Sequence, residues 1–192
     1  DDDSDAMHLA ELARLGLVHE GLILAREERA LRDLLRQRLR FVQQSVTLLH
    51  SIQSLCCRVT GKTLSANAFR ALKMPEIERM FHDPIVRIGA LARIRAWQAL
   101  QDEVDIVTRA VLKHQTDRPG LILLKSAPGI GRILGLTVLL ETGPISRFAS
   151  VGDYASYCRM VDSVRLSNGK KKGQGNRKCG NRYLCWAYIE AA

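Results

Sequence analysis

The sequence has 192 residues, of which 46% are hydrophobic and 26% are charged, a composition typical of a globular protein. Lys and Arg number 29 against 20 Asp and Glu, which gives a formal net charge of +9. No apolar run approaches the ~20 residues of a membrane-spanning helix, and the acidic N-terminus is the reverse of a secretory signal peptide. These features argue against secretion and membrane insertion and favour a cytoplasmic protein. The basic charge favours a polyanionic partner, most often nucleic acid.

Apolar residues recur at helical spacing along most of the chain, which predicts an all-α fold. A short helix is expected over residues 5–15. A single long helix is expected over 27–60, where two adjacent heptad rows form a broad apolar stripe and Gly61 takes the C-cap position. A connector with short helical pieces precedes a second long helix over 84–115, which begins at a proline. The two long helices are expected to pair antiparallel, as a hairpin or coiled coil, either within one chain or between two copies.

Beyond Pro119-Gly120 glycine and proline become frequent, which indicates a second module. No strand-like alternation is long enough there to predict a sheet. Short helices are expected at about 120–126, 131–142, 151–158 and 181–192. The predicted organisation is an acidic start over 1–16, a long helical hairpin or coiled coil over 17–118, and a C-terminal module over 119–192.

The segment Pro128-Gly129-Ile130-Gly131 separates two of these helices and is typical of the turn of a helix-hairpin-helix. Two glycines permit a tight turn and leave backbone N–H groups free at the start of the next helix. Such groups, together with the helix dipole, bind a phosphate without reading base sequence. An ordinary tight turn is the alternative. The residues expected to contact nucleic acid here are Gly129, Ile130, Gly131 and Arg132.

The segment 163–182 contains seven basic residues, four glycines and no acid. This composition predicts a flexible segment that follows a phosphate backbone and releases counterions as it binds. Ser167 precedes the turn sequence Asn168-Gly169, which would leave its hydroxyl exposed. A serine in that position is usually only a turn residue, because no neighbouring side chain is evidently placed as its base. The basic residues are Arg165, Lys170, Lys171, Lys172, Arg177, Lys178 and Arg182.

Asp2 and Asp5 lie three residues apart at the start of the first helix, so their carboxylates face one way and can share a divalent cation. Magnesium sites for phosphoryl chemistry usually use more carboxylates. Acidic residues at a helix N-terminus are also favoured by the helix dipole alone. The five histidines and five cysteines show no metal-ligand spacing and no disulfide framework.

The order of these features is more specific than any one of them. The acidic start over 2–10 resembles the last acidic motif of a RuvC-like nuclease domain. Downstream come the Pro128–Gly131 turn, Arg147-Phe148, the Ser167–Gly173 segment and Gly180–Leu184. This series resembles the DEDD-type insertion-sequence transposases, a family associated with bridge-RNA-guided recombination.

The resemblance implies a mechanism and partners. A RuvC-like fold gathers four carboxylates around Mg²⁺, and Asp2 and Asp5 match the last two. Ser167 matches the serine that attacks a DNA phosphodiester and holds the strand as a covalent phosphoserine. A structured guide RNA would select the DNA sequence, and the long helices would join copies into a homo-oligomer.

The same resemblance predicts that residues 1–16 are the remnant of a RuvC-like domain whose core is missing. The metal site is therefore expected to be incomplete, and the chain is expected not to transfer DNA strands by itself. The complete protein would be a bacterial cytoplasmic protein associated with the nucleoid.

Two other classes of function stay open on the sequence. One is a non-catalytic helix-hairpin-helix module that binds nucleic acid and tolerates Ser167→Ala in every assay. The other is an assembly protein whose long helices pair with a partner and which does not bind nucleic acid at moderate salt.

Overall fold

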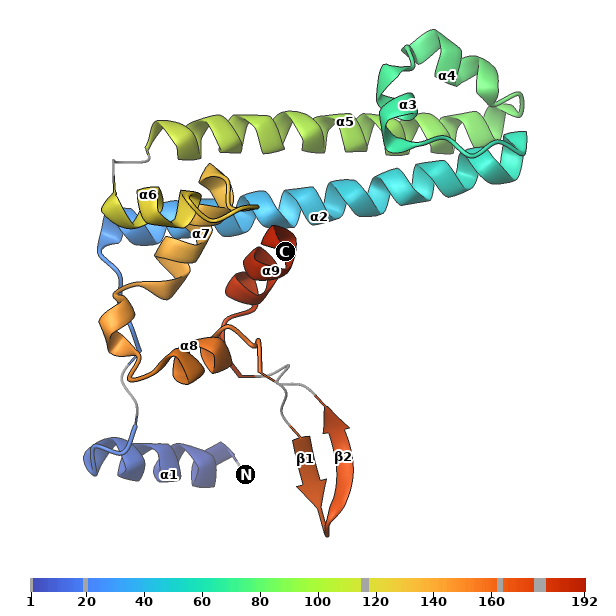
Figure 1. The fold of residues 1–192 in the computed structure, drawn as a ribbon. Helices are drawn as coiled ribbons and strands as arrows, with labels where there is room; N and C mark the ends of the chain where they lie inside the picture. Colours follow the sequence, from blue (N-terminus) through green and yellow to red (C-terminus); the bar gives the residue numbers. More distant parts are fainter. Residues whose placement is uncertain (1, 19–20, 115–117, 162–163, 175–178) are drawn as a thin grey trace.

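The computed structural model describes residues 2–18, 21–114, 118–161, 164–174 and 179–192 (Figure 1). The expected helical fold is confirmed, and the helices lie within a few residues of their expected ranges. The expectation that no sheet forms was wrong, because a short antiparallel hairpin lies near the C-terminus. In chain order the elements are α1 (Asp2–Arg14), α2 (Arg26–Thr60), α3 (Ala66–Ala71), α4 (Met74–Met80), α5 (Pro84–Lys113), α6 (Pro119–Lys125), α7 (Arg132–Thr142), the 3₁₀ helix η1 (Ile145–Arg147), α8 (Val151–Tyr157), β1 (Val164–Ser167), β2 (Lys170–Gln174) and α9 (Arg182–Ala191).

Local signals set the ends of the two long helices. α2 contains neither Gly nor Pro and ends at Gly61, whose φ of +70° is left-handed and whose N–H donates to the Cys57 carbonyl. α5 begins with Pro84 at its first position, after the N-cap residue Asp83. The Asp83 carboxylate accepts a hydrogen bond from the Ile85 N–H at 2.8 Å, so it satisfies a donor that the helix leaves unpaired.

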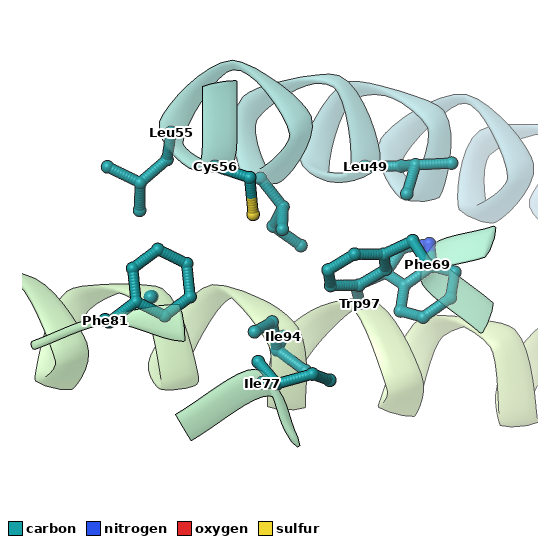
Figure 2. Close-up of a cluster of buried hydrophobic side chains, with 10 residues drawn as sticks. Leu49, Leu55, Cys56, Phe69, Ile77, Phe81, Ile94 and Trp97 are labelled. Carbon is teal, nitrogen blue, oxygen red and sulfur yellow. The ribbon is translucent and has the colours of Figure 1, made fainter. Parts of the chain in front are cut away.

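The two long helices run antiparallel and lie side by side within one chain (Figure 1). α3 and α4 cover their far end. Figure 2 shows the buried side chains that join these four helices, with Cys56 of α2 and Ile94 of α5 both fully buried. The Phe69 ring meets the Trp97 ring edge-on, with centroids 5.6 Å apart, and this geometry is favourable for aromatic pairs. The cluster fixes the closed end of the helical hairpin.

The opposite end of the helical hairpin shares a core with the C-terminal module. Leu35 of α2 and Val111 of α5 pack with Leu121 of α6 and with Leu136 of α7. A second cluster, which includes the buried Leu184, holds α8 and α9 against α7. Hydrophobic contacts therefore cross the expected boundary at residue 118, and the division into domains stays a prediction.

α1 lies apart from these clusters (Figure 1) and has no buried residue. Its apolar side chains Met7 and Leu9 are 76% and 61% exposed. Among the described residues, no helix combines the length and the apolar character needed to cross a bilayer.

Candidate nucleic-acid interface

The segment that contains Ser167 forms the β1–β2 hairpin. Ser167 is the last residue of β1 and pairs with Lys170 across the turn. The two turn residues, Asn168 and Gly169, both have positive φ, +51° and +71°. Positive φ at both positions is the mark of a type I′ turn, for which Asn-Gly is the preferred sequence. The Asn168-Gly169 dipeptide was the sequence signal available for this hairpin. The lysines that follow it lack the alternation of apolar residues that usually marks a strand.

The hairpin carries four of the seven basic residues predicted to hold phosphate. Arg165 pairs with Gly173 and Leu166 with Lys171, so Lys172 is an extra residue that forms a bulge in β2. Residues 164–174 of the predicted flexible segment thus form a β-ribbon rather than a loop. A two-stranded ribbon is narrow enough to enter the major groove of DNA. Arg177 and Lys178 lie outside the described residues.

Hydrogen bonds join the end of α8 to the residues that precede α9, two segments that flank the hairpin in the sequence. The Arg159 guanidinium donates two hydrogen bonds to the Gly180 carbonyl, at 3.1 and 2.9 Å, and the Asn181 N–H donates to the Tyr157 carbonyl at 2.6 Å. Gly180 has a φ of +80°, and a Cβ there would lie 2.6 Å from the Tyr157 carbonyl oxygen. The close backbone approach at Gly180 therefore requires glycine.

The predicted helix-hairpin-helix turn lies between α6 and α7. Gly129 has a φ of +82°, and a Cβ there would lie 2.0 Å from the carbonyl oxygen of Ala191, so the end of α9 packs against this side of the turn. Gly131 is the N-cap of α7 and provides no side-chain cap for its first N–H groups. Gly131 and Arg132 are exposed, and Ile130 is half-buried. The turn lies between two helices, as expected, while its assignment to a helix-hairpin-helix and its binding of phosphate stay predictions.

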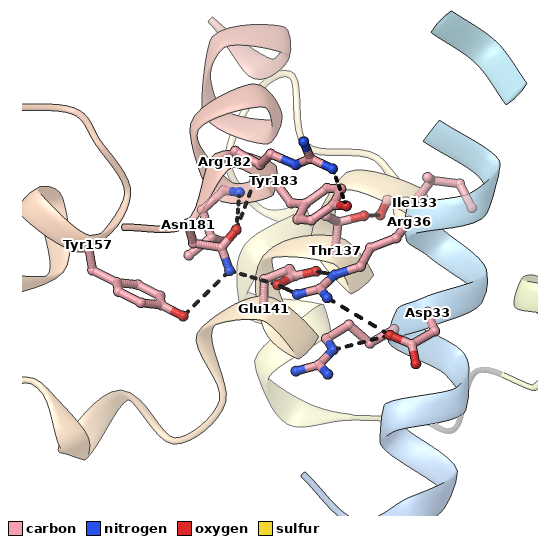
Figure 3. A network of polar contacts seen from close by, with 11 residues as sticks. Asp33, Arg36, Ile133, Thr137, Glu141, Tyr157, Asn181, Arg182 and Tyr183 are labelled. Carbon is pink, nitrogen blue, oxygen red and sulfur yellow. Dashed lines mark hydrogen bonds and ion pairs between the residues drawn. The ribbon is translucent and has the colours of Figure 1, made fainter. Parts of the chain in front are cut away.

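Sequence reasoning missed a buried carboxylate that joins three helices (Figure 3). The Glu141 side chain, only 2% exposed, accepts hydrogen bonds from Arg36 Nε at 2.6 Å and Arg36 Nη2 at 2.7 Å. It also accepts one from Asn181 Nδ2 at 2.7 Å. Paired contacts of this kind are among the strongest hydrogen bonds in proteins, and the contact with Glu141 raises the pKa of Arg36. A lone acid near the end of the apolar helix α7 was the available signal.

Asn181 links this carboxylate to the start of α9. Its side-chain oxygen accepts hydrogen bonds from the N–H groups of Tyr183 and Leu184, at 2.8 and 3.2 Å, while its amide nitrogen donates to Glu141. One side chain therefore caps α9 and ties it to α7.

The predicted phosphate ligand Arg182 is exposed and lies beside the ring of Tyr183. Its Nη2 donates to the Tyr183 hydroxyl at 2.9 Å, and its guanidinium lies 4.9 Å from the ring centroid. Burial opposes ionisation of this tyrosine, but the hydrogen bond from Arg182 and the nearby cations outweigh it and lower the pKa of Tyr183. Arg182 therefore holds a fixed place at the start of α9.

Asp2 and Asp5 lie on the exposed surface of α1. Within the part of the chain that the structure describes, no group of three or more His, Cys, Asp or Glu residues is placed to hold a metal ion. Asp2 and Asp5 therefore gain no third ligand from the described residues.

Residues 122–192 match the sequence model of a transposase family described as IS116/IS110/IS902. The matched region contains most of α6, the turn before α7, the β1–β2 hairpin and α9. This part of the chain is therefore similar to an insertion-sequence transposase. No curated protein is similar enough to the chain to count as a match.

Proposed function

We propose, from the match of residues 122–192 to a transposase family, that the chain is the DNA-handling part of an insertion-sequence transposase. The observation that carries the proposal is the position of Ser167 within the matched region. It lies directly before a type I′ turn in a hairpin that contains three consecutive lysines. This arrangement gives a candidate nucleophile next to groups that attract a phosphate backbone.

In the proposed reaction the Ser167 hydroxyl attacks the phosphorus of a DNA phosphodiester. A bond forms between the serine oxygen and phosphorus, and the bond from phosphorus to the leaving strand breaks. The serine gives up its proton, and the leaving strand departs with a hydroxyl end. The phosphoserine keeps the energy of the broken bond, so attack by a second strand end reverses the step and joins a new pair of strands.

Asp2 and Asp5 are proposed as two of the four carboxylates that hold Mg²⁺ in a RuvC-like fold. Two exposed carboxylates, without a third ligand among the described residues, do not complete such a site, so no step is assigned to the metal. We also propose DNA and a structured guide RNA as partners, a homo-oligomer joined through α2 and α5, and association with the bacterial nucleoid.

The first test is nucleic-acid binding across a salt series. Replacing Lys170, Lys171 and Lys172 together by Ala is expected to weaken binding to duplex DNA. It should also make the dependence of log K on log salt shallower by up to about 2.7, since each phosphate contact contributes about 0.9 to the slope. Filter binding or fluorescence anisotropy measures this slope.

The matched control replaces three exposed lysines elsewhere, Lys62, Lys73 and Lys113, so the net charge falls equally. An equal change of slope in both triple variants would show that the hairpin makes no specific contribution. No binding of the unaltered chain to DNA or to structured RNA would contradict the proposed function itself.

The second test concerns Ser167 in a complete transposase that includes the acidic domain. Ser167→Ala is expected to abolish the covalent protein–DNA adduct on a denaturing gel, because the only oxygen that can form it is removed. Ser54→Ala, an exposed serine on α2, should leave the adduct unchanged. Strand exchange that survives Ser167→Ala would favour the non-catalytic binding module instead.

A further inference from the structure

A pocket of about 390 Å³ opens beside the Glu141 network. Its walls include Arg32 of α2, Arg147 at the end of η1, and the aromatic residues Phe148 and Tyr157. The volume is within the range of small-ligand sites, and the lining combines cations with aromatic rings. We call it the Arg32–Arg147 pocket.

Arg32 carries a buried donor without a matching acceptor. Its side chain is 21% exposed, and its Nε has no hydrogen-bond partner among the described residues. Oδ1 of Asp33 lies 3.7 Å from this Nε, close enough for an ion pair but beyond hydrogen-bond distance. Asp33 is itself 61% exposed and lies 4.0 Å from Arg36 as well. Because an unpaired buried cationic donor is unfavourable, Arg32 is suited to an anion that enters the pocket.

Glu141 does not fill this need, although it also lines the pocket. Its two oxygens already accept three hydrogen bonds from Arg36 and Asn181. Across the described part of the chain, no carboxylate forms an ion pair with Arg147. Among the described residues, Arg147 thus has no ion-pair partner, and Arg32 has only the exposed Asp33.

The guanidinium of Arg147 offers a flat surface as well as a charge. It lies 4.6 Å from the ring centroid of Phe148 and 4.6 Å from that of Tyr157. The two centroids are only 5.3 Å apart, so both rings lie in the same general direction from the guanidinium carbon, and neither ring covers the side of Arg147 that is turned away from them. Arg147 is exposed, so that face can stack on a nucleobase.

We propose that the Arg32–Arg147 pocket binds one nucleotide of an unpaired segment of nucleic acid. Arg32 contacts the phosphate, and the uncovered face of Arg147 stacks on the base. A base within a duplex is covered by its neighbours and cannot stack in this way, so the pocket selects unpaired over paired strands. The inference rests on the proposed function, because it assumes that the chain binds nucleic acid.

A second pocket lies beside the first. It has a volume of about 280 Å³, shares Tyr157 with the first pocket, and is lined by Arg159, Gly180 and Arg182. Arg159 is joined to Gly180 by two hydrogen bonds, and Arg182 is the first residue of α9. A strand bound in the Arg32–Arg147 pocket can therefore continue past Arg159 and Arg182.

The experiment measures the affinity of the whole chain for short single-stranded DNA, single-stranded RNA of the same sequence, and duplex DNA. Arg147→Gln is expected to weaken binding of single strands by about tenfold or more, the usual effect of losing a stacked base. Arg32→Gln is expected to weaken it as well, because it removes the charged contact with the phosphate. Arg58→Gln, an exposed arginine at the far end of α2, removes the same charge outside the pocket. Arg147→Lys keeps the charge but loses the flat guanidinium, so its affinity for single strands should stay below that of the unaltered chain.

Melting temperatures separate binding from folding. Arg32→Gln is expected to leave the melting temperature unchanged or to raise it, since the native protein leaves the Arg32 Nε without an acceptor. A large fall would show that Arg32 is structural and would overturn the proposal.

Equal losses of single-strand affinity in Arg32→Gln, Arg147→Gln and Arg58→Gln would also overturn the proposed pocket. In that case, binding of duplex DNA by the unaltered chain would still support the proposed function. If the unaltered chain binds none of the three nucleic acids, both the inference and the proposed function fail. If the pocket variants lose affinity for single-stranded RNA alone, the pocket binds RNA. If they lose affinity for single-stranded DNA and RNA alike, the pocket recognises the phosphate and base that both share.

Discussion

Replacing Glu141 by Ala is expected to lower the free energy of unfolding by about 3 kcal/mol. Loss of one partner of a buried ion pair typically costs about 3–5 kcal/mol. The lower end applies because the Arg36 side chain is 28% exposed and can reach water. The change also removes an acceptor for the Asn181 amide, which ties α9 to α7. Urea denaturation followed by circular dichroism measures the difference.

Two further variants separate the ion pair from general damage. Glu190→Ala, an exposed acid on α9, should change stability by less than about 0.5 kcal/mol. The double variant Arg36→Met, Glu141→Leu removes both charges together and should recover much of the stability, since apolar replacement of a buried pair is often neutral. A double variant as unstable as Glu141→Ala would show that the pair is not the cause.

Replacing Gly129 by Ala is expected to cost about 3 kcal/mol or more. A left-handed conformation at a residue with a Cβ costs about 1–3 kcal/mol. The new Cβ would also lie 2.0 Å from the Ala191 carbonyl oxygen, so the end of α9 must shift. Overpacking of this kind adds typically 1–3 kcal/mol. Thermal or urea unfolding of the two proteins gives the difference.

Gly131→Ala is the matched control two residues away. Gly131 has a φ of −81°, and a Cβ there would meet nothing within 4 Å, so a change below about 1 kcal/mol is expected. Equal effects of the two substitutions would mean that the left-handed conformation and the contact with α9 do not determine stability at this turn.

The helices were predicted well because their signals are local. Gly61 ends α2 and Pro84 begins α5 as expected, and each acts on groups a few residues away. The hairpin was missed although its turn signal, Asn168-Gly169, is also local. The lysines of β2 have little strand preference, so the turn and the backbone pairing between the two strands, rather than apolar alternation, define the hairpin.

The candidate site was predicted in part. Gly129 lies in the turn before α7, Gly131 caps that helix, and Ser167 ends the strand before the Asn168-Gly169 turn. Residues 122–192 match a transposase family. The roles of the three residues, like those of Asp2 and Asp5, stay predictions. The sequence predicted no ligand-binding role for the side chains of Tyr157 and Arg147. A tyrosine and an arginine in a helical module have no characteristic spacing that indicates a ligand pocket.

The sequence by itself determined where the helices start and end, that the chain is basic, and which segment concentrates that charge. These properties depend on composition and on interactions between residues at most a few positions apart. Only the tertiary structure decided that α2 pairs with α5 of the same chain, and that Arg36 meets Glu141 across 105 positions. It alone placed Arg32 and Arg147 around one pocket. Such contacts depend on how the helices pack against one another, and residues that packing brings together have no characteristic separation in the sequence.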